Sequence, residues 1–211
     1  MRIGILLLFL LPLAALGDAR VRPISWAQPV LGVELDNFYQ LTPEVYRSKQ
    51  PDDEAMSALE GMGMRTVLNL REYHSDEDEA RGTALKLYRV PVNAGDVDDK
   101  FVLESLRVIA NAEKPVLIHC WHGSDRTGVV SAMYRMVFQG WSREAAMDEF
   151  INGGYGYHQR FYPNIERYLE NVDIDAMRKQ LEHDIGRAIP ERESLGGVSA
   201  VSTPRVQHAL P

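Results

Sequence analysis

Apolar residues fall in two patterns along this chain, short continuous runs and longer stretches with helical spacing. The short runs are typical of strands, and they cover residues 38–41, 44–47, 64–70, 85–90 and 116–118. The first two runs flank Thr42-Pro43, a turn pair that predicts a β-hairpin. The longer stretches predict helices, and they cover residues 51–59, 100–110, 129–138, 143–151, 161–169 and 174–181.

Strands and helices alternate over the first part of the chain, and helices alone follow. This order predicts an α/β fold of three layers, with a central, mostly parallel sheet flanked by helices. Neither an internal repeat nor a linker argues for a second domain, so one folded domain is expected at residues 37–184. Residues 18–36 have little periodicity and are expected to form an extended N-terminal arm. Residues 185–211 are expected to be a flexible C-terminal tail.

The first residues have the pattern of a cleavable signal peptide. Arg2 gives a basic start, residues 3–13 are mostly apolar, and residues 15–17 place small side chains at the −3 and −1 positions before Asp18. The apolar run is too short to span a bilayer as a stable helix. We therefore expect a signal peptide at 1–17, a periplasmic or secreted location, and no stable membrane insertion after cleavage. The alternative is an uncleaved membrane anchor.

Charge and cysteine content narrow the functional classes. The 211 residues carry a formal net charge of −7, which gives no electrostatic basis for binding nucleic acid. Cys120 is the only cysteine, so no intramolecular disulfide can form. A lone thiol in an oxidising compartment needs an explanation, and catalysis supplies one. The alternative is a buried, inert cysteine.

Residues 115–128 place this cysteine in a phosphate-binding geometry. An apolar strand runs into Cys120, a loop containing glycine follows, and a segment compatible with a helix comes after Arg126. Backbone N–H groups of such a loop and the helix N-terminus converge on one point and favour an anion there. Cys120 then supplies a nucleophilic thiolate, and the planar guanidinium of Arg126 matches two phosphate oxygens at once. The predicted phosphate-binding residues are Trp121, His122, Gly123, Ser124, Asp125 and Arg126.

Two neighbours of the loop are expected to support it. The hydroxyl of Thr127 can donate to the cysteine sulfur and stabilise it as a leaving group in a second chemical step. His119 is expected to shape the loop through hydrogen bonds of its ring, and the alternative is an ordinary buried histidine.

Other residues have open roles around the loop. Arg71 follows a predicted strand, at the sheet edge where open α/β sheets bind ligands, so its side chain faces either the site or solvent. The acidic run at 75–79 is expected to be a solvated loop or a helix start. Trp121, Tyr155 and Tyr157 are candidate walls of a pocket, with ordinary packing as the alternative.

A thiolate in a phosphate-binding loop is suited to attack a phosphate ester. The alkoxide or phenolate that leaves the ester needs a proton, so a carboxylic acid is expected near the thiol. Asp96 is our first choice because it follows a predicted strand and adjoins Gly95, which leaves it free to project. Asp98 and Asp99 lie in the same loop but have the ordinary role of capping the next helix. Asp125 is the second choice, since a carboxylate inside an anion site is unfavourable unless it is protonated or turned outward.

The sequence His119-Cys120-x5-Arg126-Thr127-Gly128 resembles the signature of the protein tyrosine phosphatase superfamily. Further segments resemble its bacterial, dual-specificity-like branch, and with the leader the chain is similar to bacterial periplasmic tyrosine phosphatases. These segments are residues 46–51, 117–123, 132–141 and 153–156. The likeness covers roughly residues 36–180 and leaves the tail outside.

The resemblance implies a protein tyrosine phosphatase-like fold and a phosphatase domain at 37–184. It implies a phosphocysteine intermediate on Cys120, phosphate clamping by Arg126, and a general acid on the loop that holds Asp96. Neither a metal nor another cofactor is implied. The expected activity is hydrolysis of phosphotyrosine, with phosphoserine and phosphothreonine as further substrates.

Two alternatives to this activity stay open. Asp125 directly before the arginine resembles the arrangement in myotubularin-like lipid phosphatases, which keeps inositol phosphates and phosphoinositides as a second substrate class. A pseudophosphatase that binds phosphate without turnover is the alternative from another class, and the intact Cys120 and Arg126 argue against it. The expected partner is therefore a phosphorylated protein or a small phosphoester, and the expected state is a monomer.

Overall fold

The sheet of the protein has the strand order β1-β2-β3-β6-β4-β5 within residues 21–190, the part of the chain that the computed structural model describes. β2 runs antiparallel to β1 and β3, and the remaining neighbours are parallel. This confirms the predicted hairpin and the mostly parallel sheet. The strands are β1 (Gln28–Pro29), β2 (Tyr39–Thr42), β3 (Val45–Ser48), β4 (Thr66–Asn69), β5 (Lys86–Arg89) and β6 (Val116–His119).

The predicted helices are all present, and most of them begin directly after a side-chain cap. Four of them start with an Asp or Ser whose side chain accepts a hydrogen bond from the backbone N–H three residues later, namely Asp52, Asp98, Ser142 and Asp173. The helices are α1 (Asp53–Gly61), α2 (Asp99–Asn111), α3 (Arg126–Gln139), α4 (Arg143–Asn152), α5 (Pro163–Asn171) and α6 (Ile174–Ile185), with a short 3-10 helix η1 (Ala94–Asp96). None of these helices, in the part of the chain that is described, is long and apolar enough to cross a membrane.

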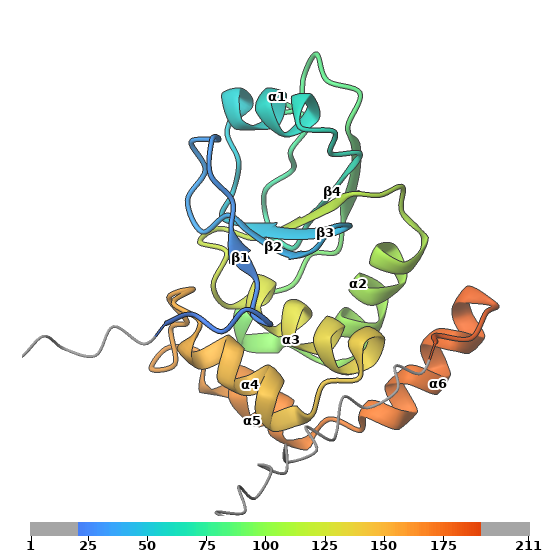
Figure 1. Ribbon diagram of the computed structural model, residues 1–211. Coiled ribbons are helices and arrows are strands. Elements are labelled where there is room, and N and C mark those ends of the chain that lie inside the picture. Colours follow the sequence, from blue (N-terminus) through green and yellow to red (C-terminus); the bar gives the residue numbers. More distant parts are fainter. Residues whose placement is uncertain (1–20, 191–211) are drawn as a thin grey trace, which may run out of the picture.

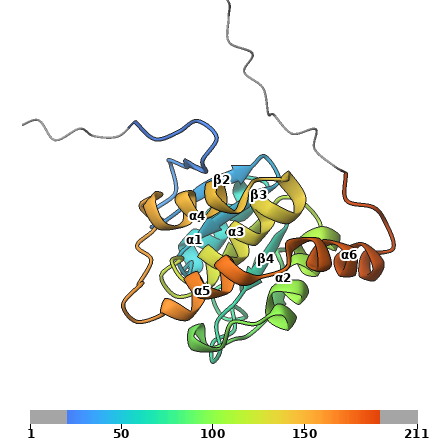
Figure 2. The same cartoon turned by 90° about the horizontal axis from the view of Figure 1, so that it is seen from below.

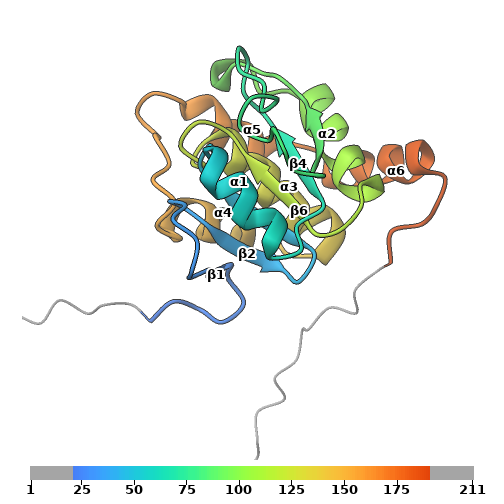
Figure 3. The ribbon, with the colours of Figure 1, turned by 90° about the horizontal axis from the view of Figure 1, so that it is seen from above.

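The helices form two unequal layers around the sheet. α1 covers one face, and α2 to α6 cover the other (Figures 1 and 3). The alternation of side chains in β6 matches this arrangement: Leu117 packs in the cluster that contains α1, while Val116 and Ile118 pack in the larger cluster on the opposite face. Seen from below, α3 lies across the middle of the sheet, between it and the outer helices (Figure 2). The three-layer prediction is confirmed.

Both ends of the described chain are more closely packed than the sequence suggested. Residues 28–29 add β1 to the sheet, and Ala27 and Leu35 are buried, so residues 21–36 are more than an extended arm. At the other end α6 continues to Ile185, and Ile189 is 4% exposed. The predicted tail therefore begins too early at residue 185. The predicted signal peptide and most of the predicted tail lie outside the described residues.

Candidate active site

The loop at residues 120–125 connects the end of β6 to the start of α3. β6 lies between β3 and β4, and all four of its residues are buried. Ser48 at the end of β3 and Asn69 at the end of β4 both pair with His119 at the end of β6. Cys120 is thus the first residue beyond a shared sheet edge, and it is 2% exposed. The predicted position of the loop, at the C-terminal end of a central strand, is confirmed.

Gly123 lets the loop lie directly against the backbone that leaves β3. Its φ is +74°, and a Cβ atom there would come within 2.5 Å of the carbonyl carbon and oxygen of Ser48. On the same side, the backbone N–H of Gln50 donates to the carbonyl of Trp121 at 3.0 Å. Only glycine combines this backbone conformation with this close approach.

Arg126 keeps hydrogen-bonding capacity free at the loop. Its Nη1 donates to the carbonyl oxygens of Val92 at 3.1 Å and Leu70 at 3.5 Å, whereas its Nε is buried and without a partner among residues 21–190. The hydroxyl of Thr127 is also buried and unpaired, so the expected bond to the Cys120 sulfur is not formed in this structure. Buried polar groups without partners are rare, and these two adjoin the predicted anion site.

His119 supports the loop through its ring, as the sequence predicted. It is fully buried, with Nε2 2.9 Å from Oδ2 of Asp76 and Nδ1 3.2 Å from the carbonyl oxygen of Cys120. The other oxygen of Asp76 accepts from Gln50 and Asn69 at 2.9 and 2.8 Å. Asp76 belongs to the acidic run at 75–79, and for this residue the prediction of a solvated loop is wrong because it is 3% exposed.

Arg47 holds the loop from the opposite side and was not predicted to have a role. Its Nη2 donates to the carbonyl of Gly123 at 2.5 Å, and its guanidinium carbon lies 3.6 Å from the ring centroid of Tyr155. The side chain is 1% exposed, and this burial lowers the pKa of Arg47, while the nearby Tyr155 and Glu149 act in the opposite direction. The loop is therefore hydrogen-bonded, through the carbonyl of Gly123, to the buried cation of Arg47.

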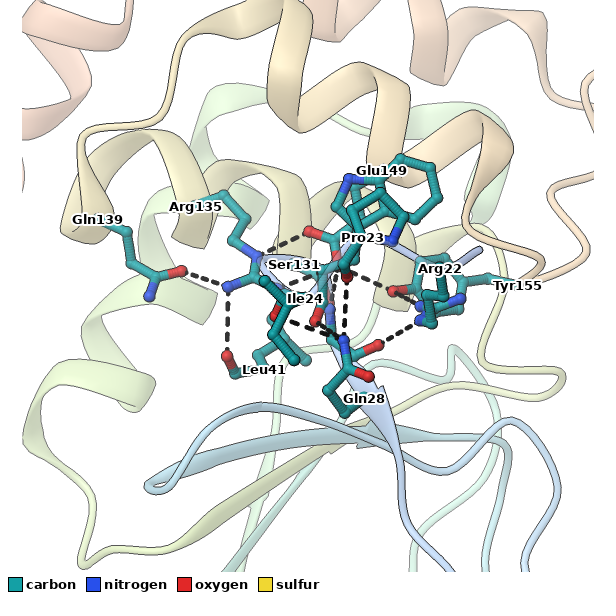
Figure 4. Close-up of polar contacts among 12 residues, drawn as sticks. Arg22, Pro23, Ile24, Gln28, Leu41, Ser131, Arg135, Gln139, Glu149 and Tyr155 are labelled. Carbon is teal, nitrogen blue, oxygen red and sulfur yellow. Dashed lines mark hydrogen bonds and ion pairs between the residues drawn. The ribbon is translucent and has the colours of Figure 1, made fainter. Parts of the chain in front are cut away.

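Tyr155, which contacts Arg47, also belongs to a polar cluster with Arg22 and Glu149. Figure 4 shows the contacts of Tyr155 within this cluster. Its hydroxyl donates to Glu149 at 2.9 Å and accepts from Arg22 at 2.6 Å. Glu149 also receives hydrogen bonds from the guanidinium of Arg135 and from the backbone N–H of Ala27. Burial raises the pKa of Tyr155, so this hydroxyl stays protonated. The predicted role of Tyr155 as a pocket wall is not seen, since the residue is 2% exposed and does not line the cavity at the loop.

Asp125 points away from the loop interior, toward His158. Its Oδ1 accepts from the backbone N–H of His158 and its Oδ2 lies 2.9 Å from Nδ1 of the same residue. The adjacent Ser124 donates its hydroxyl to the carbonyl of Tyr155 at 2.7 Å. Both carboxylate oxygens of Asp125 are thus engaged by His158. This arrangement favours a role for Asp125 in orienting His158 over a role as the general acid.

A cavity of about 340 Å³ opens at the loop. Of the three predicted walls, Trp121 lines it, whereas Tyr155 and Tyr157 do not. His158, Phe161 and Tyr162 line it and were missed, because the aromatic spacing of residues 155–162 does not reveal which rings turn inward. The lining residues are Cys120, Trp121, His122, Asp125, Arg126, His158, Phe161 and Tyr162.

Arg71 lies beside the site. Its guanidinium carbon is 4.4 Å from the ring centroid of Trp121, and its Nη1 donates to Oε1 of Gln50 at 3.2 Å. Burial and the charge of Arg126 lower the pKa of Arg71. A second cation therefore stands against one wall of the cavity.

The three aspartates of the loop before α2 differ in their surroundings. Oδ1 of Asp98 caps α2 by accepting from Phe101 N at 2.8 Å, as predicted, and Asp99 accepts from the hydroxyl of Tyr168 at 2.9 Å. Asp96 is exposed at the end of η1 and has no side-chain hydrogen bond among residues 21–190. It does not line the cavity, although its loop touches Arg126 through the carbonyl of Val92.

Two groups in the described chain bring three potential metal ligands within 4.8 Å of one another. They are His122 with Asp125 and His158, and His74 with Asp76 and Glu79. In both groups the aspartate already accepts hydrogen bonds from neighbouring side chains. The phosphoryl-transfer chemistry predicted for the loop does not call on a metal ion at either place.

Phosphoryl transfer to cysteine requires a thiol at an anion-binding loop and a free guanidinium donor in the same place. Cys120 and Arg126 supply these groups at one cavity, so the fold and the site together define the class of cysteine-dependent phosphatases. The model of the tyrosine phosphatase family matches residues 32–189. The chain belongs to this family.

Relatives of this chain are named for two different activities. The dual specificity protein phosphatase TpbA of Pseudomonas aeruginosa is 36% identical over 185 residues, covering 86% of this chain and 81% of TpbA. Its crystal structure has a TM-score of 0.69 at 33% identity, covering 76% of this chain and 99% of that one. The inositol diphosphatase SIW14 of Saccharomyces cerevisiae is 30% identical over 158 residues, covering 68% of this chain and 53% of SIW14.

Proposed function

We propose that this protein hydrolyses phosphotyrosine through a phosphocysteine intermediate, with phosphoserine and phosphothreonine as further substrates. The observation that carries the proposal is the meeting of Cys120 and the unpaired Nε of Arg126 at one cavity. The relative TpbA supports the substrate class, because it is named a dual specificity phosphatase and has been crystallised with phosphotyrosine.

The loop geometry provides the first chemical step. The thiolate of Cys120 attacks phosphorus, an S–P bond forms, and the bond to the leaving phenolate oxygen breaks. The loop amides and Arg126 hold the three remaining oxygens, whose charge is spread over them in the transition state. Asp96 is proposed to give its proton to the leaving oxygen, since Asp98 and Asp99 are occupied by other bonds.

The walls of the cavity favour an aromatic leaving group. Trp121 is 59% exposed and Phe161 is 75% exposed, although large apolar side chains usually bury more of their surface. A phosphorylated tyrosine can place its phosphate in the loop and its ring between such side chains. A phosphoserine reaches the same loop with a shorter side chain and makes less of this contact.

A substrate panel tests the proposal. We expect kcat/KM for a phosphotyrosine peptide to exceed that for the matched phosphoserine peptide, and Cys120→Ser to abolish both activities. Inositol pyrophosphate belongs in the same panel, because SIW14 is named an inositol diphosphatase and Arg71 offers a second cation for an additional phosphate. Preference for that compound would move the assignment to the second substrate class. If none of the substrates is hydrolysed between about pH 5 and pH 7, the proposal that the protein is an enzyme is wrong.

We also propose that the protein is exported. The support is the basic, apolar and small-residue pattern of residues 1–17 and the presence of a single cysteine. Sequencing of the N-terminus of the mature protein tests this, with Asp18 as the expected first residue. An N-terminus at Met1 would contradict export by a cleaved leader.

A further inference from the structure

The carbonyl oxygens of residues 120–123 each lie within hydrogen-bonding distance of a nitrogen atom outside the loop. The nitrogen atoms are Nδ1 of His119, the backbone N of Gln50, Nδ2 of Asn37 and Nη2 of Arg47, at 3.2, 3.0, 2.9 and 2.5 Å in that order. Asn37 lies just before β2 and Arg47 lies in β3, so both reach the loop from distant parts of the sequence. The outer side of the loop is thus fixed at four consecutive carbonyl groups.

These contacts set the direction of the loop N–H groups. The peptide units of the loop are planar and trans, so each N–H points opposite to the C=O of the same unit. The N–H groups of residues 121–124 therefore point away from the four outer nitrogen atoms. None of these N–H groups donates a hydrogen bond within residues 21–190, so all four are available to an anion bound at the loop.

Arg47 is a buried cation without an ion-pair partner in the described chain. The other buried arginine there, Arg135, pairs with Glu149 at 2.7 Å, whereas Nε of Arg47 has no hydrogen-bond partner at all. Burial lowers the pKa of Arg47, while Tyr155, Glu149 and the Cys120 thiolate act in the opposite direction. An unpaired buried cation is costly, and an anion bound at the loop supplies the opposite charge.

Asn37 has an unusual backbone conformation. Its φ is +55°, and it is the only residue other than glycine with a positive φ in the described chain. Such conformations persist where the surrounding contacts require them, and they concentrate at functional sites. Here Nδ2 of Asn37 donates to the carbonyl of Tyr155 at 2.9 Å as well as to the carbonyl of His122. One side-chain amide therefore holds both the loop and the segment that follows α4.

We infer that Arg47 and Asn37 are positioning residues, which hold the loop amides in the direction that binds a phosphate. The inference rests on the proposed phosphatase function. Neither side chain lines the cavity, so both act through the peptide units of the loop. The bond from Arg47 polarises the peptide between Gly123 and Ser124, which makes the N–H of Ser124 a stronger donor. The bond from Asn37 has the same effect on the N–H of Gly123, with a neutral donor in place of a charged one.

Calorimetric titration of the Cys120→Ser protein with a phosphotyrosine peptide measures this effect, because that protein binds the peptide without hydrolysing it. We expect the addition of Arg47→Met to raise Kd about 10- to 100-fold, as for the loss of a charge-assisted hydrogen bond. Arg47→Lys keeps the charge and should recover part of the affinity. Asn37→Gly adopts the positive φ without strain and removes only the neutral donor, so it should raise Kd about 5-fold.

Arg178→Met is the matched control and should leave Kd unchanged, because Arg178 on α6 also donates to backbone carbonyls but to none in the loop. Urea titration shows whether each variant is folded, and if Arg47→Met is not, Asn37→Gly decides alone. A Kd equal to that of the control in Asn37→Gly or in folded Arg47→Met would overturn the inference, and so would an Arg47→Lys protein that binds no better than Arg47→Met. If the Cys120→Ser protein itself does not bind the peptide, the proposed function fails, and this result is distinct from a failure of the variants alone.

Discussion

Nε2 of His119 and Oδ2 of Asp76 lie 2.9 Å apart, with side-chain exposures of 0% and 1%. The pair connects the residue before the nucleophile to the segment that follows β4. Burial opposes ionisation of Asp76, but hydrogen bonds from His119 and Gln50 hold the pKa of its carboxyl below the usual value. Asp76 is therefore a buried anion that the loop depends on.

Replacing this anion should destabilise the protein. We expect Asp76→Asn to lower the free energy of unfolding by about 3 kcal/mol, because His119 loses the charged partner of a buried pair. Urea titration at neutral pH measures the change. Asp78→Asn in the same acidic run is the control, since Asp78 is 87% exposed, and it should change stability by less than about 0.5 kcal/mol. Equal effects of the two substitutions would contradict the buried pair.

The same carboxyl should make stability depend on acid. A group whose pKa is lowered by folding stabilises the protein fully above its unfolded pKa, here about 4, and loses that contribution as the pH falls through the folded value. The difference in unfolding free energy between wild type and Asp76→Asn should thus be complete at neutral pH and shrink below about pH 4. A difference that stays constant down to pH 3 would show that Asp76 is not an anion in the native state.

Gly123→Ala should disable the loop. The added methyl group would meet the Ser48 backbone at 2.5 Å and would also require an unfavourable φ of +74°. Gly82 has a φ of +90° but open space around it, so Gly82→Ala isolates the backbone strain of about 1 to 2 kcal/mol. We expect both variants to lose stability and only Gly123→Ala to lose most of its kcat on an aryl phosphate. Comparable kcat values would show that the loop tolerates the side chain.

Arg126→Lys should lower kcat by about 100- to 1,000-fold, the cost of removing one donor that stabilises transition-state charge. Lysine keeps the positive charge but cannot offer two parallel N–H groups to phosphate oxygens. The control is Arg81→Lys, because Arg81 is 78% exposed and forms only a surface ion pair. A wild-type kcat in Arg126→Lys would mean that the positive charge alone stabilises the transition state, without two parallel N–H donors.

Asp96→Asn tests the general acid through the leaving group. Loss of the acid should slow hydrolysis of an alkyl phosphate by about 100-fold or more and affect an activated aryl phosphate much less. Asp98→Asn tests the rival in the same loop, since asparagine also caps helices and should leave α2 intact. If Asp98→Asn, and not Asp96→Asn, slows the alkyl phosphate more than the aryl phosphate, then Asp98 is the general acid.

The architecture could be predicted because its signals are local. The apolar run that becomes β6, the proline turn at Thr42-Pro43 and the caps at Asp52 and Ser142 each act within a few residues of their position. The nucleophile and the clamp could be predicted for the same reason, because one loop carries both. Their placement at the end of a central strand then followed from the order of the elements.

The parts that were missed depend on partners distant in sequence. Asp76 stands in an acidic run beside the exposed Glu77 and Asp78, but its carboxylate is bonded by the distant side chains of His119, Gln50 and Asn69. Arg47 faces Gly123 across 76 positions of the chain. Tertiary packing also decides that His158 and Phe161 line the cavity and that Tyr155 is buried against Arg47. No periodicity in residues 153–162 indicates either outcome.

The contacts of Arg22 have a consequence for how the protein is produced. Its guanidinium donates to the carbonyl of Gly153 and to the hydroxyl of Tyr155. The ring of Tyr155 in turn lies against Arg47, which donates a hydrogen bond to the carbonyl of Gly123 in the loop. The predicted cleavage before Asp18 leaves only residues 18–21 ahead of it. Recombinant protein that starts after residue 22, or carries a bulky tag at that point, would lack the outer support of its own catalytic loop.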